Sequence, residues 1–366
     1  MADATGTLET ARTVARDHLK GIAETGMPGR VNRPLVAALA EHGLLQRLFP
    51  EDGSVPARQL CLLREGIAYV SPEAETALAL QGLGSYPILQ SGSGHLSGRW
   101  IPEVAAGRAI AAFALTEPDA GSDAAALSLR AEPDADGFRL TGEKRWISNA
   151  PDADVYTVFA RTGEGDGSRG VSAFAVEGGS TGLTGESLDL VAPHPIGSLV
   201  FDGVLVPRTH ILGQPGRGFE VAMRTLDLFR PSVGAFAVGM AQAALDASVA
   251  HAAERRAFDR PLKEFQAISH RLADMATKLE AARLLVYRAA GKYAAGEPVT
   301  QASAMAKLYA TEAAQEIVDA AIQIHGARAL EKGHMLEHLY REVRATRIYE
   351  GTSEIQRNIV ARSLFA

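Results

Sequence analysis

The stretch RIYEGTSEIQR, residues 347–357, carries a carboxylate, Glu350, between an aromatic residue and a glycine. Glycine has no Cβ, so a ligand can approach the backbone closely at Gly351. Ser353 and Gln356 match the Ser-x-x-Gln pattern that begins a helix, which predicts that Glu350 lies in a loop just before a helix N-terminus. A carboxylate held there can act as a general base, although the segment alone also fits a solvated acid before an ordinary helix.

The composition of the chain is that of an ordinary globular protein. Its 366 residues are 46% hydrophobic and 22% charged, which indicates two or three domains with a large core. The net charge of −6 comes from 37 basic and 43 acidic residues without long blocks of one sign. We therefore expect neither a nucleic acid nor a membrane as a partner.

Three further features bear on the cellular compartment. Cys61 is the only cysteine, which excludes an intrachain disulfide and a cysteine-based metal cluster and fits a reducing compartment. Residues 1–20 contain three acidic residues and predict an amphipathic helix rather than a signal peptide. No uncharged apolar run approaches the ~20 residues that span a bilayer. We expect a cytoplasmic protein.

The sequence pattern changes twice along the chain. Residues 1–110 show helical spacing of apolar residues, with Pro and Gly at the junctions. Residues 111–215 contain short apolar runs broken by Gly, Pro, Asp and Ser, which is typical of an antiparallel β domain. Residues 216–366 return to the helical period in long apolar stripes, which predicts a helical bundle. The expected fold class is α+β, with one domain for each of these three ranges.

A second informative patch lies at the start of the middle segment. Residues 116–123 read TEPDAGSD, in which small residues could leave backbone N–H groups and the hydroxyls of Thr116 and Ser122 facing a polar ligand. Trp146 and Ser148 then offer an aromatic ring beside a hydroxyl, which can flank a planar cofactor. Each pattern alone also fits a turn or a core tryptophan.

Taken together, these motifs resemble those of the acyl-CoA dehydrogenase family. They follow one another in the same order as in that family and cover nearly the whole chain. The remaining motifs that carry the resemblance are Phe201-Asp202-Gly203-Val204 with Val206-Pro207, Arg255-Arg256-Ala257-Phe258, Phe265-Gln266, Gln323-Ile324-His325-Gly326 and Tyr349-Glu350-Gly351-Thr352. The resemblance implies a helical domain, a β domain and a C-terminal four-helix domain, with FAD between the β domain, the C-terminal domain and a neighbouring subunit.

The resemblance also assigns roles to individual residues. FAD contacts are implied for Leu115, Thr116, Gly121, Ser122, Trp146, Ile147, Ser148, Gln266, Gln323, Gly326, Thr352 and Glu354. Arg255 and Phe258 look like the family residues that reach the FAD of a second subunit, which implies a homo-oligomer, a dimer or tetramer. Acyl-CoA contacts are implied for Ser122, Asp227, Arg230, Tyr349 and Gly351.

The implied reaction is the α,β-dehydrogenation of an acyl-CoA to the 2-enoyl-CoA in fatty acid or acyl-CoA metabolism. Glu350 looks like the base that removes the α-proton, while the flavin accepts the β-hydride and an electron-transferring flavoprotein is the expected electron acceptor. Enclosure by an apolar acyl chain would raise the pKa of Glu350 through desolvation. Some family members place the base on a helix, where this chain has Phe229, with Asp227 as the nearest competitor.

Some positions depart from the family pattern, and two other functions stay open. Asp259 and Ala327 stand where the family usually has glycine, so the adenosine end of FAD could be held differently. The acyl group could instead be carried by a carrier protein, since a fold does not determine a substrate. Finally, His334, Glu337 and His338 match the His-x-x-Glu-His pattern of zinc hydrolases, which equally fits the polar face of a short helix.

Overall fold

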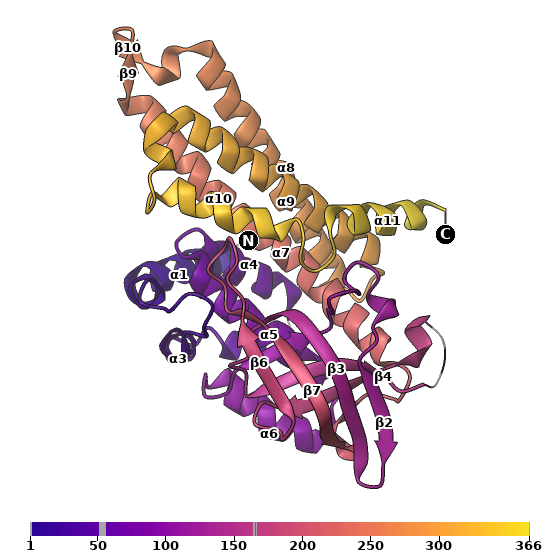
Figure 1. Cartoon of the computed structure of the whole chain (residues 1–366). Coiled ribbons are helices and arrows are strands. Elements are labelled where there is room, and N and C mark those ends of the chain that lie inside the picture. Colours follow the sequence, from indigo (N-terminus) through magenta and orange to yellow (C-terminus); the bar gives the residue numbers. More distant parts are fainter. Residues whose placement is uncertain (1, 51–55, 164, 166, 366) are drawn as a thin grey trace. The chain divides into compact units, whose positions relative to one another are not determined.

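The computed structural model describes residues 2–50, 56–163, 165 and 167–365, which form two compact units (Figure 1). The first unit comprises Met1–Asp17, Pro56–Glu75 and Asp227–Ala366, and the second comprises His18–Val55 and Thr76–Leu226. Along the chain, helices give way to strands near residue 110 and return after residue 215, as the sequence predicts. The α+β fold class is therefore confirmed, whereas the three domain boundaries stay predictions.

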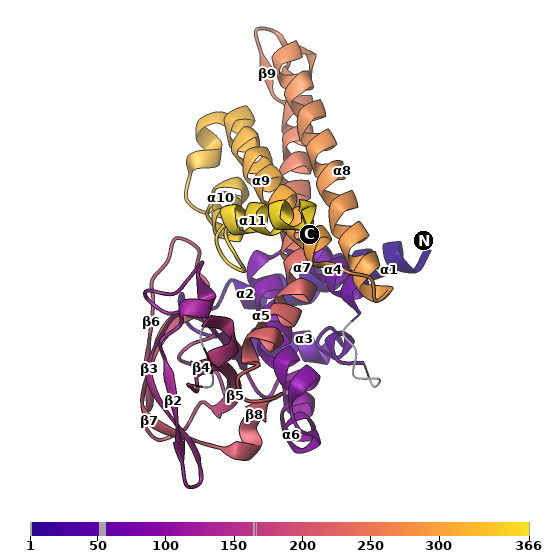
Figure 2. The same ribbon diagram turned by 90° about the vertical axis from the view of Figure 1, so that its right-hand side faces the viewer.

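The first unit is helical. Its N-terminal part contains α1 (Ala2–Val14) and α4 (Ala57–Ala68). Its C-terminal part contains α8 (Gln266–Ala294), α9 (Thr300–His325), α10 (Met335–Thr346) and α11 (Ser353–Leu364). Helix α7 (Gly218–Glu254) belongs to this unit from Asp227 onward. Among the described residues, the predicted C-terminal bundle therefore consists of three long helices and two short ones. Figures 1 and 2 both show α8 and α9 side by side.

Small residues allow the long helices of this unit to approach one another closely. A Cβ added at Gly234 of α7 would lie 2.7 Å from Val286 of α8 and 3.3 Å from Ala310 of α9. A Cβ at Gly239 would lie 2.4 Å from the carbonyl oxygen of Glu65 on α4. Because a real Cβ does not approach backbone atoms that closely, glycine at these positions sets the helix spacing.

Helix α7 is also long and apolar enough to cross a membrane by length and composition. Its most apolar 18-residue window is, however, 72% buried inside the protein. That degree of burial is typical of a core helix, because a membrane-spanning helix presents much of its apolar surface to lipid.

The second unit combines helices with an eight-stranded sheet. Its helices are α2 (Lys20–Ala23), α3 (Arg33–Glu41), most of α5 (Pro72–Ser91) and α6 (Gly94–Ala105). The strands are β1 (Ala111–Ala114), β2 (Arg130–Asp134), β3 (Gly137–Ser148), β4 (Val155–Arg161), β5 (Val171–Glu177), β6 (Leu183–Ser187), β7 (Ile196–Pro207) and β8 (Ile211–Leu212). Figure 2 shows α5 and α6 on one side of this sheet.

The sheet runs in the order β6-β7-β3-β2-β4-β5-β8, with β1 paired to β4. The pairings are antiparallel as predicted, except that β1 and β2 each pair with β4 in parallel. Strands β4 and β5 are buried over six consecutive residues, which explains their continuous apolar sequences. Their core includes Val155 and Phe159 packed with Leu96 and Trp100 of α6.

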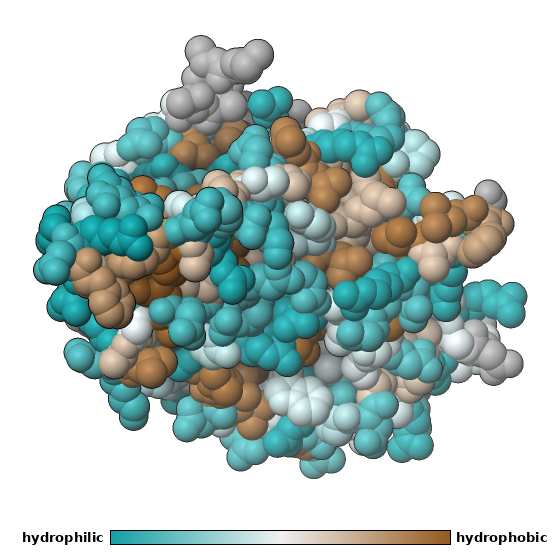
Figure 3. All heavy atoms as spheres, turned by 90° about the horizontal axis from the view of Figure 1, so that it is seen from above, coloured by the Kyte–Doolittle hydropathy of each residue, from teal (hydrophilic) through white to brown (hydrophobic). Residues whose placement is uncertain are grey.

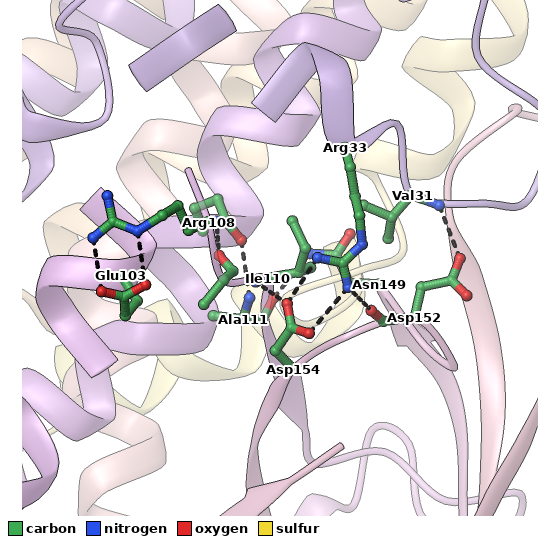
Figure 4. Close-up of polar contacts among 11 residues, drawn as sticks. Val31, Arg33, Glu103, Arg108, Ile110, Ala111, Asn149, Asp152 and Asp154 are labelled. Atoms are coloured by element: carbon green, nitrogen blue, oxygen red, sulfur yellow. Dashed lines mark hydrogen bonds and ion pairs between the residues drawn. The ribbon is translucent and has the colours of Figure 1, made fainter. Parts of the chain in front are cut away.

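A polar network connects α3 and the preceding loop to the start of β4 (Figure 4). The Asp154 carboxylate accepts hydrogen bonds from the Ile110 backbone N–H at 2.7 Å and from Arg33 at 3.0 and 3.1 Å. Asn149 donates from its side chain to the Ala111 carbonyl at 2.8 Å, and Arg30 pairs with Asp152. These bonds hold the ends of β1 and β4 in place.

We expect Asp154→Ala to lower the free energy of unfolding by about 1–3 kcal/mol, because the buried N–H of Ile110 loses its side-chain acceptor. Urea unfolding followed by circular dichroism measures the change. The matched control is Asp136→Ala, which removes an exposed carboxylate from the β2–β3 turn and should change the free energy by less than about 0.5 kcal/mol. Equal effects of the two substitutions would contradict the role assigned to Asp154.

Large hydrophobic side chains are exposed at separate points of the chain. Phe258 is 90% exposed and Phe365 is 91% exposed. On the face drawn in Figure 3, hydrophobic residues form several separate groups among hydrophilic ones. Single exposed hydrophobic residues are common on soluble proteins, so the expected homo-oligomer stays a prediction.

Candidate active site

Glu350 lies in the turn between α10 and α11, as the sequence predicts. Its backbone is left-handed, with φ +53°, and Gly351 follows at φ +92°. A Cβ at Gly351 would lie 2.7 Å from the Gln356 side-chain nitrogen, so both φ and space favour glycine there. A left-handed glutamate is uncommon, and such a conformation persists only where the surrounding structure holds it.

Three buried side chains hold this turn through its carbonyl oxygens. The Glu350 carbonyl accepts hydrogen bonds from Arg230 Nε at 3.2 Å and Gln356 Nε2 at 3.1 Å. The Gly351 carbonyl accepts from Lys307 Nζ at 2.7 Å and Gln356 Nε2 at 3.0 Å. The donors come from α7, α9 and α11, and we call these four hydrogen bonds the carbonyl clamp.

The start of α11 differs from the expected capping box. Thr352, not Ser353, is the N-cap residue, and its hydroxyl accepts a hydrogen bond from the Ile355 N–H. Ser353 is the first helical residue and donates to Glu312 at 2.5 Å. Gln356 donates to the loop carbonyls of the clamp. The predicted loop position of Glu350 is therefore right, but the predicted N-cap is wrong by one residue.

The Glu350 carboxylate is in an environment suited to a base. Its Oε2 atom is buried and has no hydrogen-bond partner among the described residues. Burial raises the pKa of Glu350, although the positive charges of Arg64, Arg230 and Lys307 act in the opposite direction. Because a raised pKa makes the ionised carboxylate a stronger proton acceptor, this environment favours a general base.

Two residues near Glu350 were not expected from the sequence. Arg64, whose charge acts most strongly on Glu350, is buried on α4, forms an ion pair with Glu75 and donates to the Ser232 hydroxyl at 2.6 Å. Lys307 lies on the alanine-rich buried face of α9. In both cases the available signal was a charged residue inside an otherwise apolar helical stripe.

Asp227, the competing carboxylate, has a different environment. Its Oδ2 accepts a hydrogen bond from the Thr300 hydroxyl at 2.7 Å, and its Oδ1 lies 3.6 Å from Arg230 Nη1. Burial raises the pKa of Asp227, while these two partners lower it. Both Asp227 oxygens are thus engaged, whereas Glu350 Oε2 is not. The geometry favours Glu350 as the base.

The second unit contains the predicted loop at residues 115–123. Its buried anchor is Glu117, which accepts hydrogen bonds from the N–H groups of Ser128 and Leu129 at 2.6 and 2.9 Å. Lys144 Nζ lies 2.9 Å from both a Glu117 carboxylate oxygen and the Leu115 carbonyl. These contacts hold the loop against β3.

Next to this anchor, the predicted cofactor residues combine an exposed aromatic ring with short polar side chains. Arg145 N–H donates to the Thr116 carbonyl, so the loop lies beside the irregular end of β3. Trp146 is 47% exposed at φ +55°, while the next residue, Ile147, is buried. An exposed indole beside short polar side chains can stack on and hydrogen-bond a planar polar ligand, so these residues fit a flavin.

A Cβ at Gly121 would meet no atom within 4 Å, and Ser122 is exposed. The loop is therefore open to solvent at the position where a phosphate contact is predicted. These contacts stay predictions.

The remaining predicted FAD residues lie in the first unit. Arg255 and Phe258 are exposed, at the end of α7 and in the short β9–β10 hairpin (Arg256–Ala257 and Arg260–Pro261). Asp259 has φ +63°, which explains why glycine suits this position and why an aspartate, which tolerates this region, can replace it. Gln266 begins α8, and Gln323 and Gly326 lie at the end of α9, all exposed.

The other predicted residues surround Glu350 in sequence. Tyr349 has a pKa raised mainly by burial, so its hydroxyl stays neutral. Thr352 is the α11 cap, and Glu354 is exposed in the first turn of that helix. Within the first unit, the structure brings Asp227, Arg230, Glu350 and Gly351 together and leaves Arg255 and Phe258 outside this cluster.

The proposed zinc ligands are not brought together. His334 caps α10 and accepts a hydrogen bond from the Leu336 N–H, while Glu337 pairs with Arg341. His338 Nε2 lies 2.9 Å from Glu73. Among the described residues, the cluster with metal-ligand spacing is Glu73, His338 and Glu342, which contains neither His334 nor Glu337. The His-x-x-Glu-His pattern here forms helix-cap and ion-pair contacts.

The Glu73–His338 pair predicts a pH-dependent contribution to stability. Burial disfavours the charged form of both residues, but the hydrogen bond and opposite charge of each residue's partner have a larger effect. The pKa of Glu73 therefore falls to about 2, and the pKa of His338 rises. The Glu73 contribution is present above its ordinary pKa of 4.5 and is lost as the pH falls toward 2. The His338 contribution is present below 6.5 and is lost as the pH rises through the raised pKa.

We therefore expect His338→Gln to lower the free energy of unfolding by about 1 kcal/mol near pH 5.5 and by less at pH 8.5. Urea unfolding of the variant and the unsubstituted protein at both pH values measures the difference. His270→Gln, at an exposed position of α8, is the control. A pH-independent difference would contradict the ion pair.

Comparison with known proteins points to the same family as the sequence motifs. Descriptions of the acyl-CoA dehydrogenase N-terminal, middle and C-terminal domains match residues 2–108, 112–204 and 216–365. Cyclohexane-1-carbonyl-CoA dehydrogenase of Geobacter metallireducens is 36% identical over 364 residues, covering 97% of this chain and 96% of that protein.

Two solved structures share the fold over almost the whole chain. Butyryl-CoA dehydrogenase from Megasphaera elsdenii has a TM-score of 0.93 and 33% identity, covering 99% of this chain and 98% of its own. PigA with FAD and proline has a TM-score of 0.94 and 28% identity, covering 100% and 98%. The resemblance drawn from the motifs is thereby confirmed. The chain belongs to the acyl-CoA dehydrogenase family of FAD-dependent oxidoreductases that act on CH–CH bonds.

Proposed function

We propose that the protein oxidises the α,β carbon–carbon bond of an acyl-CoA thioester and that Glu350 removes the α-proton. The observation that carries this assignment is the buried Oε2 of Glu350, which lacks a hydrogen-bond partner among the described residues while the backbone of the same residue is clamped. A structural carboxylate at such a position would normally be paired, as Asp227 is. An unpaired oxygen is instead available to a proton.

The chemistry follows from the environment of the carboxylate. The thioester carbonyl acidifies the α-proton, and the C–H bonding pair moves toward that carbonyl as Glu350 takes the proton. Burial raises the pKa of Glu350, so the product carboxylic acid is stabilised relative to an exposed glutamate. Bound FAD supplies the two-electron acceptor for the hydride that leaves the β-carbon. The α- and β-carbons then share the new double bond.

The resemblance in motifs implies FAD contacts at residues of each unit. In the second unit, the 115–122 loop, which is open at Gly121 and Ser122, offers hydroxyls and backbone groups, and Trp146 offers an exposed aromatic ring beside Ser148. In the first unit, the ends of α7 and α9, the start of α8 and the cap of α11 carry the other predicted contacts. The likeness in motifs supports Arg255 and Phe258 as contacts to the FAD of a second copy of the chain.

The same resemblance supports three further parts of the proposal. Asp227, Arg230 and Tyr349 contact the acyl-CoA, electrons leave to an electron-transferring flavoprotein, and the protein is a homo-oligomer. A cytoplasmic location, expected from the single cysteine, also belongs to the proposal. The names of the relatives, which act on cyclohexane-1-carbonyl-CoA and butyryl-CoA, point to a short or cyclic acyl group rather than a long chain.

Anaerobic mixing of the FAD-loaded protein with single acyl-CoA thioesters tests this function. The panel contains butyryl-CoA, hexanoyl-CoA, palmitoyl-CoA and cyclohexane-1-carbonyl-CoA, and loss of the oxidised flavin absorbance reports the reaction. We expect bleaching by a short or cyclic thioester and formation of the enoyl-CoA. A flavin that dithionite reduces but that no thioester reduces would overturn the proposal. Bleaching by palmitoyl-CoA alone would overturn the proposed acyl class.

A further inference from the structure

Lys307 combines complete burial with a specific contact to the catalytic loop. The residue lies on α9 with no exposed surface, and its Nζ donates to the Gly351 carbonyl at 2.7 Å. Burying an ammonium group is costly unless partners compensate for the lost water. Burial accordingly lowers the pKa of Lys307 to about 8, with Glu350, Glu312 and Glu354 acting in the opposite direction and Arg230 in the same direction. This cost calls for a role beyond packing.

The backbone that Lys307 contacts is unusual. Glu350 and Gly351 are consecutive left-handed residues, and a glutamate in this conformation is held only by its surroundings. Arg230 contacts the first carbonyl, Lys307 the second, and Gln356 both. Gln356 belongs to α11, which begins three residues after Glu350, so it moves with the loop. Glu312 of α9 holds the two ends of the loop through Arg347 and Ser353. Among the described residues, Lys307 and Arg230 are the side chains of the long helices that donate to the carbonyls of Glu350 and Gly351.

The two long-helix donors are not equivalent. Arg230 is shared with Asp227, at 3.6 Å, and its bond to the Glu350 carbonyl is the longer of the two at 3.2 Å. The Lys307 bond is a shorter, charge-assisted contact to the partly buried Gly351 carbonyl. We propose that Lys307 is a positioning residue, which sets the direction of the Glu350 carboxylate by fixing the Gly351 carbonyl. This inference rests on the proposed role of Glu350 as the base.

Two substitutions of Lys307 distinguish the effect of its hydrogen bond on the loop position from the effect of its positive charge. Lys307→Met keeps the length and apolar stem of the side chain but removes the donor and the charge. Lys307→Gln removes the charge and keeps an N–H donor near the same place. Lys278→Met, at a partly exposed lysine of α8 that pairs with Glu316, is the matched control in the same unit.

Two readouts are needed. Hydrogen–deuterium exchange of residues 346–353 reports the order of the loop in the FAD-loaded protein without any substrate. Single-turnover flavin reduction at saturating acyl-CoA reports proton removal. We expect Lys307→Met to speed exchange of this segment and to slow flavin reduction by on the order of 10²-fold, since small misplacement of a catalytic group has effects of that size. We expect Lys307→Gln to be intermediate in both readouts and Lys278→Met to be unchanged.

The outcomes discriminate between roles. Wild-type exchange and wild-type reduction in Lys307→Met would overturn the proposal. Equally slow reduction in the Met and Gln variants with unchanged exchange would show that the charge matters and the position does not, which also overturns it. If Lys307→Met fails to fold, the Gln variant alone decides between the same results. Failure of the unsubstituted protein to react with any thioester would remove the proposed function, while the exchange result would still test the clamp.

Discussion

Glu350→Gln is expected to slow single-turnover flavin reduction by acyl-CoA by ~10²–10⁴-fold, the usual contribution of a general base. Glutamine keeps the size of the side chain and lacks the basic oxygen. The backbone contacts of Arg230, Lys307 and Gln356 do not involve the substituted carboxylate, so the loop should stay ordered. Stopped-flow absorbance of the flavin measures the rate, and the ratio of flavin to protein absorbance verifies that FAD is retained.

Asp227→Asn is the discriminating control for this prediction. Asp227 is engaged by Thr300 and Arg230, so its substitution should alter acyl-CoA binding more than the rate at saturation. A wild-type reduction rate for Glu350→Gln would show that Glu350 is not the base. A large loss confined to Asp227→Asn would move that role to α7.

Lys144→Met is expected to lower the free energy of unfolding by about 3–5 kcal/mol, the range typical when one partner of a buried ion pair is removed. Lys144 is fully buried and Glu117 is 3% exposed, so the remaining carboxylate has little access to water. Burial lowers the pKa of Lys144 to about 8, against the pairing with Glu117, and the ammonium form still dominates at neutral pH. Urea unfolding at pH 7 measures the loss.

The same substitution should also weaken FAD retention. Lys144 contacts the Leu115 carbonyl, and Glu117 holds the end of the loop that carries the predicted flavin contacts. We expect a loosened loop to bind FAD less tightly, measured by flavin fluorescence after gel filtration. Lys20→Met, at an exposed lysine of the same unit, is the control and should change neither quantity. Wild-type stability of Lys144→Met would contradict the structural role of the pair.

The sequence was sufficient to predict the order of helices and strands, because the spacing of apolar residues reflects burial on one face of each element. Fully buried strands such as β4 and β5 stand out as continuous apolar runs, and the short motifs around Trp146 and Glu350 survive as local patterns. The family could be recognised for the same reason. Its motifs lie within single loops and strand ends, where residue identity and backbone conformation are linked locally.

Other properties depended on residues that are distant in the chain. The N-cap of α11 shifted from Ser353 to Thr352 because Ser353 donates to Glu312, a residue of α9. The parallel pairing of β1 and β2 with β4 had no local signal, since strand direction is decided by the path of the chain between strands.

The sequence by itself determined which carboxylate is exceptional, since Glu350 stands beside an obligatory glycine in a short motif. Only the tertiary structure decided its chemical state. Arg64, Arg230 and Lys307 come from three different helices, and their distance from Glu350 in the chain hides their influence on its pKa. Electrostatic energy depends on the distance between charges, and desolvation depends on how deeply a group is buried. The packing of the helices determines both, and a local sequence pattern contains no information on either.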